Sequence, residues 1–259
     1  MRPLESHIRI GSPRNSQISP NDTMTPKPLS WFSLIGLFGL PTAMNAIACQ
    51  AVIPYLDGQQ VFPIEVTYFL RVGGLVLAPM LVLAVYLSGR DAGSFRLVDI
   101  LTRMRVKRLS CTDWMWTVAA FVVLSLASFL IAKVAMPVLH LDATPFFFKN
   151  MPLKSDFLWI LYVWPLFFFF NIFGEEFLWR GYIQPRQELL TKKWTWLIHG
   201  LLWAIWHIPM GGDLILAATP IFFVLPAVVQ IRQNTSIAIV VHAVFGGFGF
   251  LSLALGAVH

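Results

Sequence analysis

Two adjacent carboxylates and an arginine lie in the apolar, aromatic segment 170–181, where ionisable side chains are costly and usually functional. On a helix, residues four apart share a face, so Glu176 and Arg180 should form an ion pair. Glu175 lies five residues before Arg180, about 140° around the helix, and is left without that partner. Asn171, one turn earlier, could hydrogen-bond Glu175. A carboxylate held in this way can act as a general base.

The same residues also have an interpretation without catalysis. A buried Glu176–Arg180 pair taken alone favours a structural role in helix packing, or a site in a proton-coupled transporter. The unpaired Glu175 shifts the balance towards catalysis.

Three histidines lie in the apolar runs that follow. His207 ends the stretch Trp203-Ala-Ile-Trp-His207, with Trp203 one turn before it on the same helix face. His199 lies eight residues earlier, about 80° around the helix, and its expected role is a helix–helix hydrogen bond. His242 lies in the last apolar run.

Depth in the bundle distinguishes two of these histidines. Glu175 precedes the Lys192-Lys193 turn by about as many residues as separate His207 from it on the other side. At about 1.5 Å per residue, the two would lie within roughly 5 Å in depth on adjacent antiparallel helices. His199 would lie far from Glu175. The arithmetic therefore pairs Glu175 with His207.

The composition indicates that membrane-spanning helices position these residues. The 259 residues are 57% hydrophobic and only 12% charged, with a mean hydropathy of +0.68, whereas soluble domains carry roughly 25% charged residues. The net charge of +6 comes from short loops between apolar runs, which favours contact with lipid headgroups and argues against nucleic acid. Cys49 and Cys111 indicate neither a disulfide framework nor a cysteine metal site.

The fold class expected is therefore an all-α, polytopic membrane bundle of about seven helices. Residues 1–30 are predicted to be a cytoplasmic disordered tail and residues 31–259 the bundle, with a catalytic core at about 157–250. Pro165 could divide the fourth span in two, giving eight, and the first span should end at Pro54. The expected spans are 31–53, 66–87, 114–138, 157–190, 195–209, 214–229 and 237–258.

The distribution of basic residues predicts the orientation. They cluster in the tail, in 90–108, in 186–193 and at Arg232, which all fall on one side of a seven-span chain. The positive-inside rule then places the N-terminus in the cytoplasm. The charged segment after the second span also predicts a short interfacial helix near 95–101.

Together these segments resemble the CPBP family of intramembrane proteases, which includes the eukaryotic CAAX prenyl endopeptidases and the prokaryotic Abi group. The family pattern is Glu-Glu-x-x-x-Arg, then an aromatic residue four positions before a histidine, then His-x-x-x-Asn. The matching stretches within 164–246 are Glu175-Glu176-Phe-Leu-Trp-Arg180, Trp203-Ala-Ile-Trp-His207 and His242-Ala-Val-Phe-Gly246.

The resemblance implies hydrolysis of a peptide bond within the membrane. Glu175 and His207 would activate water, and His242 would stabilise the oxyanion. The family asparagine that shares this last role is replaced by Gly246, so Asn171 could supply the donor instead, or activity is weakened or lost. Glu175, His207 and His242 would also suit zinc or another divalent metal as ligands, although a glutamate-activated water needs no cofactor.

The partners expected are the lipid bilayer and a membrane-associated peptide or protein substrate, prenylated or not. The location expected is a multi-pass position in a bacterial inner membrane. The competing hypothesis is a catalytically inactive scaffold, immunity factor or transporter that keeps the motif for structure. It predicts that Glu175 and His207 do not converge, or that no cavity reaches them.

Overall fold

The computed structural model describes residues 26–142 and 144–257, and every regular element in this part of the chain is a helix. This confirms the all-α prediction. Most of the predicted tail, residues 1–25, lies outside the described residues. The first helix begins after Ser30, whose hydroxyl accepts a hydrogen bond from the backbone N–H of Ser33 at 3.1 Å and so caps the helix.

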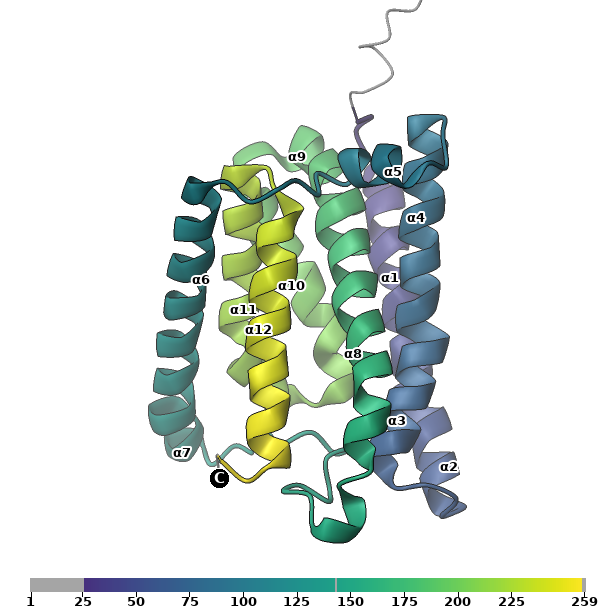
Figure 1. The fold of residues 1–259 in the computed structure, drawn as a ribbon, viewed down its shortest axis with the longest axis vertical. Coiled ribbons are helices and arrows are strands. Elements are labelled where there is room, and N and C mark those ends of the chain that lie inside the picture. The colour runs from purple at the N-terminus through teal and green to yellow at the C-terminus, as the bar shows by residue number, and fades with distance from the viewer. Residues whose placement is uncertain (1–25, 143, 258–259) are drawn as a thin grey trace, which may run out of the picture.

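The long elements form a bundle (Figure 1). In the first half they are α1 (Trp31–Ile47), η1 (Ala48–Val52), α2 (Ile53–Gly58), α3 (Ile64–Val72), η2 (Gly73–Leu77), α4 (Ala78–Ala92), α5 (Leu97–Arg103), α6 (Cys111–Leu130), η3 (Ile131–Ala135) and α7 (Met136–Leu139). In the second half they are η4 (Ser155–Phe157), α8 (Ile160–Glu176), η5 (Phe177–Ile183), α9 (Gln184–Thr191), η6 (Lys192–Trp194), α10 (Thr195–His207), η7 (Ile208–Met210), α11 (Gly212–Arg232) and α12 (Thr235–Ala254).

Among the described residues, 6 continuous helices are long and apolar enough to cross a membrane, so the chain is an integral membrane protein. One of them, Ile160–Met210, has 51 residues, about 75 Å of helix, more than twice the thickness of a bilayer core. It reverses at η6, so that α8–α9 and α10 run in opposite directions (Figure 1). Counting this reversal gives the seven passages expected.

The structure decides one alternative and corrects one prediction, both concerning prolines. Pro165 lies inside α8 and does not divide it, which removes the eight-span alternative. The first span does not end at Pro54, because helix continues to Gly58. A π-helical turn ends two residues before Pro54, and the same arrangement precedes Pro79, Pro137 and Pro185. Proline has no N–H for the carbonyl four residues before it, and its ring clashes with that carbonyl in an α-helix. In each case this carbonyl lies in the π turn, so the helix continues through the proline.

The two ends of the bundle differ in charge. We call one the basic end: it carries α5, η6 and the α11–α12 connection, with Arg90, Arg96, Arg103, Arg105, Lys107, Arg108, Arg186, Lys192, Lys193 and Arg232. The other, the loop end, carries the connections 59–63 and 140–159 (Figure 1). As predicted, a short helix follows the second span, and α5 lies across the basic end.

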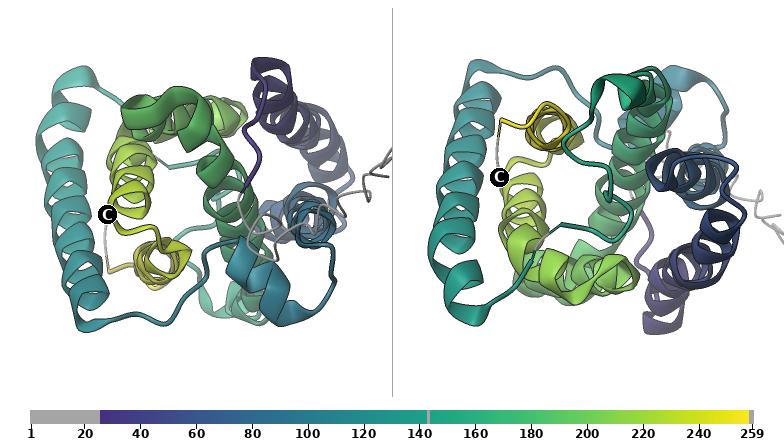
Figure 2. Two further views of the ribbon diagram at one scale, coloured as in Figure 1. Left: turned by 90° about the horizontal axis from the view of Figure 1, so that it is seen from above. Right: turned by 90° about the horizontal axis from the view of Figure 1, so that it is seen from below.

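Helix α8 is packed between α3–α4 on one side and α12 on the other (Figure 2). Its first part exposes Tyr162 and Leu166, whereas its last residues, Gly174 to Glu176, are buried. Gly174 permits the contact with η2, because a Cβ there would lie 2.5 Å from the carbonyl oxygen of Leu77. Gly200 does the same for α10 and α11, where a Cβ would lie 2.6 Å from the carbonyl oxygen of Phe222. These close contacts fix the helices that carry the acidic and histidine motifs.

Candidate active site

The two carboxylates end α8, directly before the π-helical turn η5. Glu175 is 1% exposed and Glu176 is fully buried. Nη1 of Arg180 lies 3.3 Å from Oε1 of Glu176, so the predicted ion pair is present, with both side chains fully buried. The π turn changes the angles assumed for an α-helix after residue 176, but the pairing of Arg180 with the second glutamate is as the spacing predicts.

Glu175 has two hydrogen-bond donors of its own. Asn171 donates from Nδ2 to Oε1 at 2.7 Å, as predicted from its place one turn earlier. Trp203 donates from Nε1 to Oε2 at 2.7 Å, a contact that spacing alone did not predict. A buried indole N–H usually finds a partner, and that rule was the available signal. The first glutamate is therefore free of arginine but held at both oxygens.

The depth arithmetic correctly separates the two histidines of α10. His207 lines the same cavity as Glu175, and its Nδ1 lies 2.9 Å from the carbonyl oxygen of Trp203. Because that oxygen can only accept, Nδ1 carries the proton and Nε2 carries the lone pair in the neutral ring. His199 is fully buried, lies outside the cavity lining, and forms a 2.8 Å hydrogen bond with Gln187, the helix–helix role expected for it.

His242 reaches the site from α12 and binds the second glutamate. Its Nδ1 lies 2.7 Å from Oε1 of Glu176. A carboxylate oxygen accepts, so Nδ1 bears the proton and Nε2 is the other ring atom available for chemistry. Sequence reasoning missed this contact. Glu176 therefore has two cationic or donor partners, Arg180 and His242, rather than one.

The ring of Trp203 joins these groups. The guanidinium carbon of Arg180 lies 3.4 Å from the ring centroid, a cation–π contact. The rings of His207 and His242 lie 5.6 and 5.8 Å from it, both edge-on. One tryptophan thus holds the glutamate through its N–H and the arginine through its face, and it contacts both histidines.

These side chains open into a cavity of about 250 Å³. The polar or catalytic-motif residues among its lining are Asn171, Glu175, Trp203, His207 and His242, and Gly246 lies beside them. At Gly246 a Cβ would meet only Cδ2 of His242, at 3.7 Å. The family asparagine position is therefore open space without a donor.

The described residues do not offer a set of metal ligands here. In residues 26–142 and 144–257, no three His, Cys, Asp or Glu side chains lie close enough to hold one metal ion. Glu175, His207 and His242, which the resemblance suggested as zinc ligands, therefore do not form such a group among the described residues.

One comparison with known proteins gave a match, which covers the segment that carries these side chains. Residues 157–248 match the family model Rce1-like, described as type II CAAX prenyl endopeptidase Rce1-like. This segment is therefore an Rce1-like domain, a domain of a protease family, which confirms the resemblance. No curated protein and no solved structure gave a significant match.

Proposed function

We propose that this protein is an intramembrane endopeptidase that hydrolyses a peptide bond of a membrane-associated peptide or protein. One observation carries the proposal: Glu175, His207 and His242, from three different helices, line a single cavity in an apolar bundle. A scaffold or transporter that kept the motif for packing would need neither the convergence nor the cavity. The match of residues 157–248 to a protease family supports the same class of reaction.

The proposed reaction begins with a water molecule between Glu175 and His207. Glu175 takes one proton from the water, and Nε2 of His207 accepts the other hydrogen as a hydrogen bond and orients the attack. The new oxygen–carbon bond turns the substrate carbonyl into a tetrahedral oxyanion. Glu175 then returns the proton to the amide nitrogen, and the peptide C–N bond breaks. Water is the only co-reactant required.

His242 is proposed to stabilise the oxyanion. With Nδ1–H bound to Glu176, a protonated ring would present Nε2–H to the cavity, and the carboxylate would balance its charge. Arg180 contacts the same carboxylate oxygen of Glu176, Oε1, and adds a positive charge there. The second amide hydrogen of Asn171, whose first is donated to Glu175, is the donor we propose in place of the family asparagine.

The proposed reaction uses water activated by Glu175 and contains no metal-bound step, because no three-ligand set is present in the described part of the chain. Zinc dependence would show as loss of hydrolysis on treatment with a chelator and its return on adding zinc. We expect hydrolysis to persist in the chelator.

Substrate trapping tests the function. The Glu175→Gln variant keeps a side chain that accepts from Trp203 but lacks the base, so it should retain substrate that wild-type protein releases as products. Proteins bound to the variant in cells would be identified and then incubated with wild-type protein. Cleavage of at least one of them by wild-type protein is expected. Failure of wild-type protein to cut any trapped protein would contradict the proposal.

A further inference from the structure

Beyond the motif residues, most of the cavity lining comes from the half of the bundle nearer the loop end: the first half of α8, the middle of α3, the segment before the middle of α11, the last turns of α12, and the connection before η4 (Figure 1). These residues are Tyr68, Phe69, Pro145, Phe147, Phe148, Trp164, Phe167, Phe168, Leu214, Ala218, Phe250 and Leu253, and Met210, Ile221 and Phe222 complete the lining.

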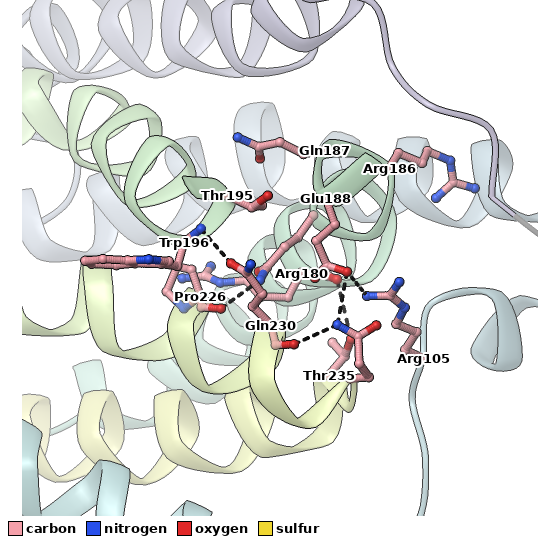
Figure 3. A network of polar contacts seen from close by, with 12 residues as sticks. Arg105, Arg180, Arg186, Gln187, Glu188, Thr195, Trp196, Pro226, Gln230 and Thr235 are labelled. Atoms are coloured by element: carbon pink, nitrogen blue, oxygen red, sulfur yellow. Dashed lines mark hydrogen bonds and ion pairs between the residues drawn. The ribbon is translucent and has the colours of Figure 1, made fainter. Parts of the chain in front are cut away.

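Towards the basic end, the path to Glu175 is filled by side chains. Arg180, Gln184, Gln187, Thr195 and Thr235 are all fully buried. Figure 3 shows this polar layer between α9, α10, α11 and the start of α12. The layer is only partly hydrogen-bonded, because the guanidinium of Arg180, Oε1 of Gln184 and Nε2 of Gln187 have no hydrogen-bond partner among the described residues. Its side chains are nevertheless fully buried, so they fill the space between the catalytic groups and the basic end.

Side chains of the polar layer form hydrogen bonds to neighbouring segments of the chain. Gln184 donates from Nε2 to the carbonyl oxygen of Pro226 at 2.7 Å, and Thr235 donates from its hydroxyl to the carbonyl oxygen of Met104 at 2.7 Å. Nearer the surface, Arg105 and Glu188 form an ion pair at 2.8 Å (Figure 3). These contacts connect four segments of chain, and opening a route for substrate would break several of them at once.

At the loop end, the cavity is covered by a short connection. Phe147 stacks on Tyr68 with ring centroids 3.5 Å apart. The backbone N–H and the side-chain amide of Asn150 both donate to the carboxylate of the buried Glu65, at 2.7 and 2.9 Å. The connection is also held by an ion pair between Lys149 and Asp57 at 3.1 Å and by ring contacts of Phe148 with Phe69 and Phe250. The cover is thus one connection that packs mainly through aromatic rings, whereas buried polar side chains of several helices fill the other side.

The two ends are also distinguished by charge. The basic end carries ten of the described lysines and arginines, set out above, whereas the loop-end connections carry only Lys149 and Lys154 together with Asp142 and Asp156. Short loops rich in lysine and arginine remain in the cytoplasm. The loop end therefore faces away from the cytoplasm.

We propose that the substrate reaches Glu175 from the extracytoplasmic side, past the Phe147 connection. Aromatic side chains dominate the lining of the cavity. The cavity volume of about 250 Å³ is below the roughly 300 Å³ at the lower end of sites for drug-sized ligands. The occupant proposed is a short peptide segment with large apolar side chains, presented at the outer face of the membrane. This inference rests on the proposed protease function for its substrate, but the direction of access can be measured without hydrolysis.

Cysteine labelling in oriented vesicles tests the direction. Ala218→Cys and Leu253→Cys place a thiol on the cavity wall, in a background with Cys49→Ala and Cys111→Ser. A membrane-impermeant maleimide should label both from outside in right-side-out vesicles. A separate Cys49→Ala variant keeps Cys111, which is exposed at the basic end, as the control. It should react only in inverted vesicles.

Labelling of the cavity thiols from outside, together with protection of Cys111, supports the proposal. If neither cavity thiol reacts from outside, or if Cys111 does, the proposal is overturned. A short peptide of phenylalanine and leucine added outside should protect the cavity thiols, whereas a serine–glycine peptide of equal length should not. Equal labelling with both peptides would overturn the proposed occupant. None of these readouts depends on catalysis, so their failure is distinct from failure of the protease function.

Discussion

Trp203 donates its indole N–H to Oε2 of Glu175 at 2.7 Å, and the face of the same ring contacts Arg180 at 3.4 Å. Two motifs 28 residues apart are thereby joined through one side chain. A phenylalanine at this position could supply the ring but not the donor. The orientation of the proposed base thus depends on the indole N–H of Trp203.

Trp203→Phe should lower kcat without unfolding the protein. The substitution keeps an aromatic face for Arg180 and removes the hydrogen bond to Glu175, and a misplaced catalytic group costs up to about 100-fold in rate. The measurement is the rate of cleavage of a trapped substrate. Trp206→Phe is the matched control, because Trp206 is equally buried on the same helix and its Nε1 has no hydrogen-bond partner in the described residues. Equal cleavage rates for the Trp203→Phe and Trp206→Phe variants would show that the hydrogen bond from Trp203 does not orient Glu175 for catalysis.

His207→Ala and His199→Ala should fail in different ways. Loss of His207 removes a group that orients water and should reduce kcat/KM by about 100-fold or more, with little change in thermal stability. Loss of His199 leaves Gln187 without its partner and should cost about 1–3 kcal/mol of stability, with kcat little changed at a temperature where the variant is folded. The assignment would be wrong if the folded His199→Ala variant lost activity to the same degree.

Gly246→Asn should increase activity. A Cβ at this position meets only Cδ2 of His242, at 3.7 Å, so a side chain fits. The new amide would add a donor near the proposed oxyanion, and such a donor is worth about 100-fold or more in other enzymes. Gly246→Ala controls for the loss of glycine flexibility and should leave the rate near that of wild type. No gain in kcat for a folded Gly246→Asn variant would show that the position does not face the oxyanion.

Gly174→Ala should destabilise the bundle. Its Cβ would lie 2.5 Å from the carbonyl oxygen of Leu77 and force α8 away from η2, at a cost of about 1–3 kcal/mol. Gly36→Ala is the control, because nothing lies within 4 Å of a Cβ there, and alanine is the better helix former by roughly 0.5–1 kcal/mol. Thermal unfolding in detergent should give a lower midpoint for the first variant and an unchanged or higher one for the second.

The parts of the site that follow from a single helix could be predicted from sequence. The pairing of Glu176 with Arg180 and of Asn171 with Glu175 needs only the helical repeat. The shared cavity of Glu175 and His207 involves two helices, but it could also be predicted, because it needs only similar distances along both helices from their shared turn. These contacts depend on local geometry that tertiary packing hardly changes.

The missed contacts depend on how helices are rotated against one another. His242 could contact Glu176 only after the packing of α12 against α8 was known, and the sequence period says nothing about that angle. The Trp203 hydrogen bond depends in the same way on α10. Four π turns each end two residues before a proline, so proline was a possible signal for them. Pro165 lies inside α8 without a π turn, which shows that proline alone does not identify them.

Hydrolysis in isotopically labelled water tests the central claim most directly. Wild-type protein and Glu175→Gln would be reconstituted in lipid vesicles with a trapped substrate in water enriched in oxygen-18, and the products analysed by mass spectrometry. We expect wild-type protein to give fragments whose new carboxyl group carries one oxygen-18 atom, and Glu175→Gln to give such fragments at least about 100-fold more slowly. Equal rates of labelled cleavage by the two proteins would contradict the account.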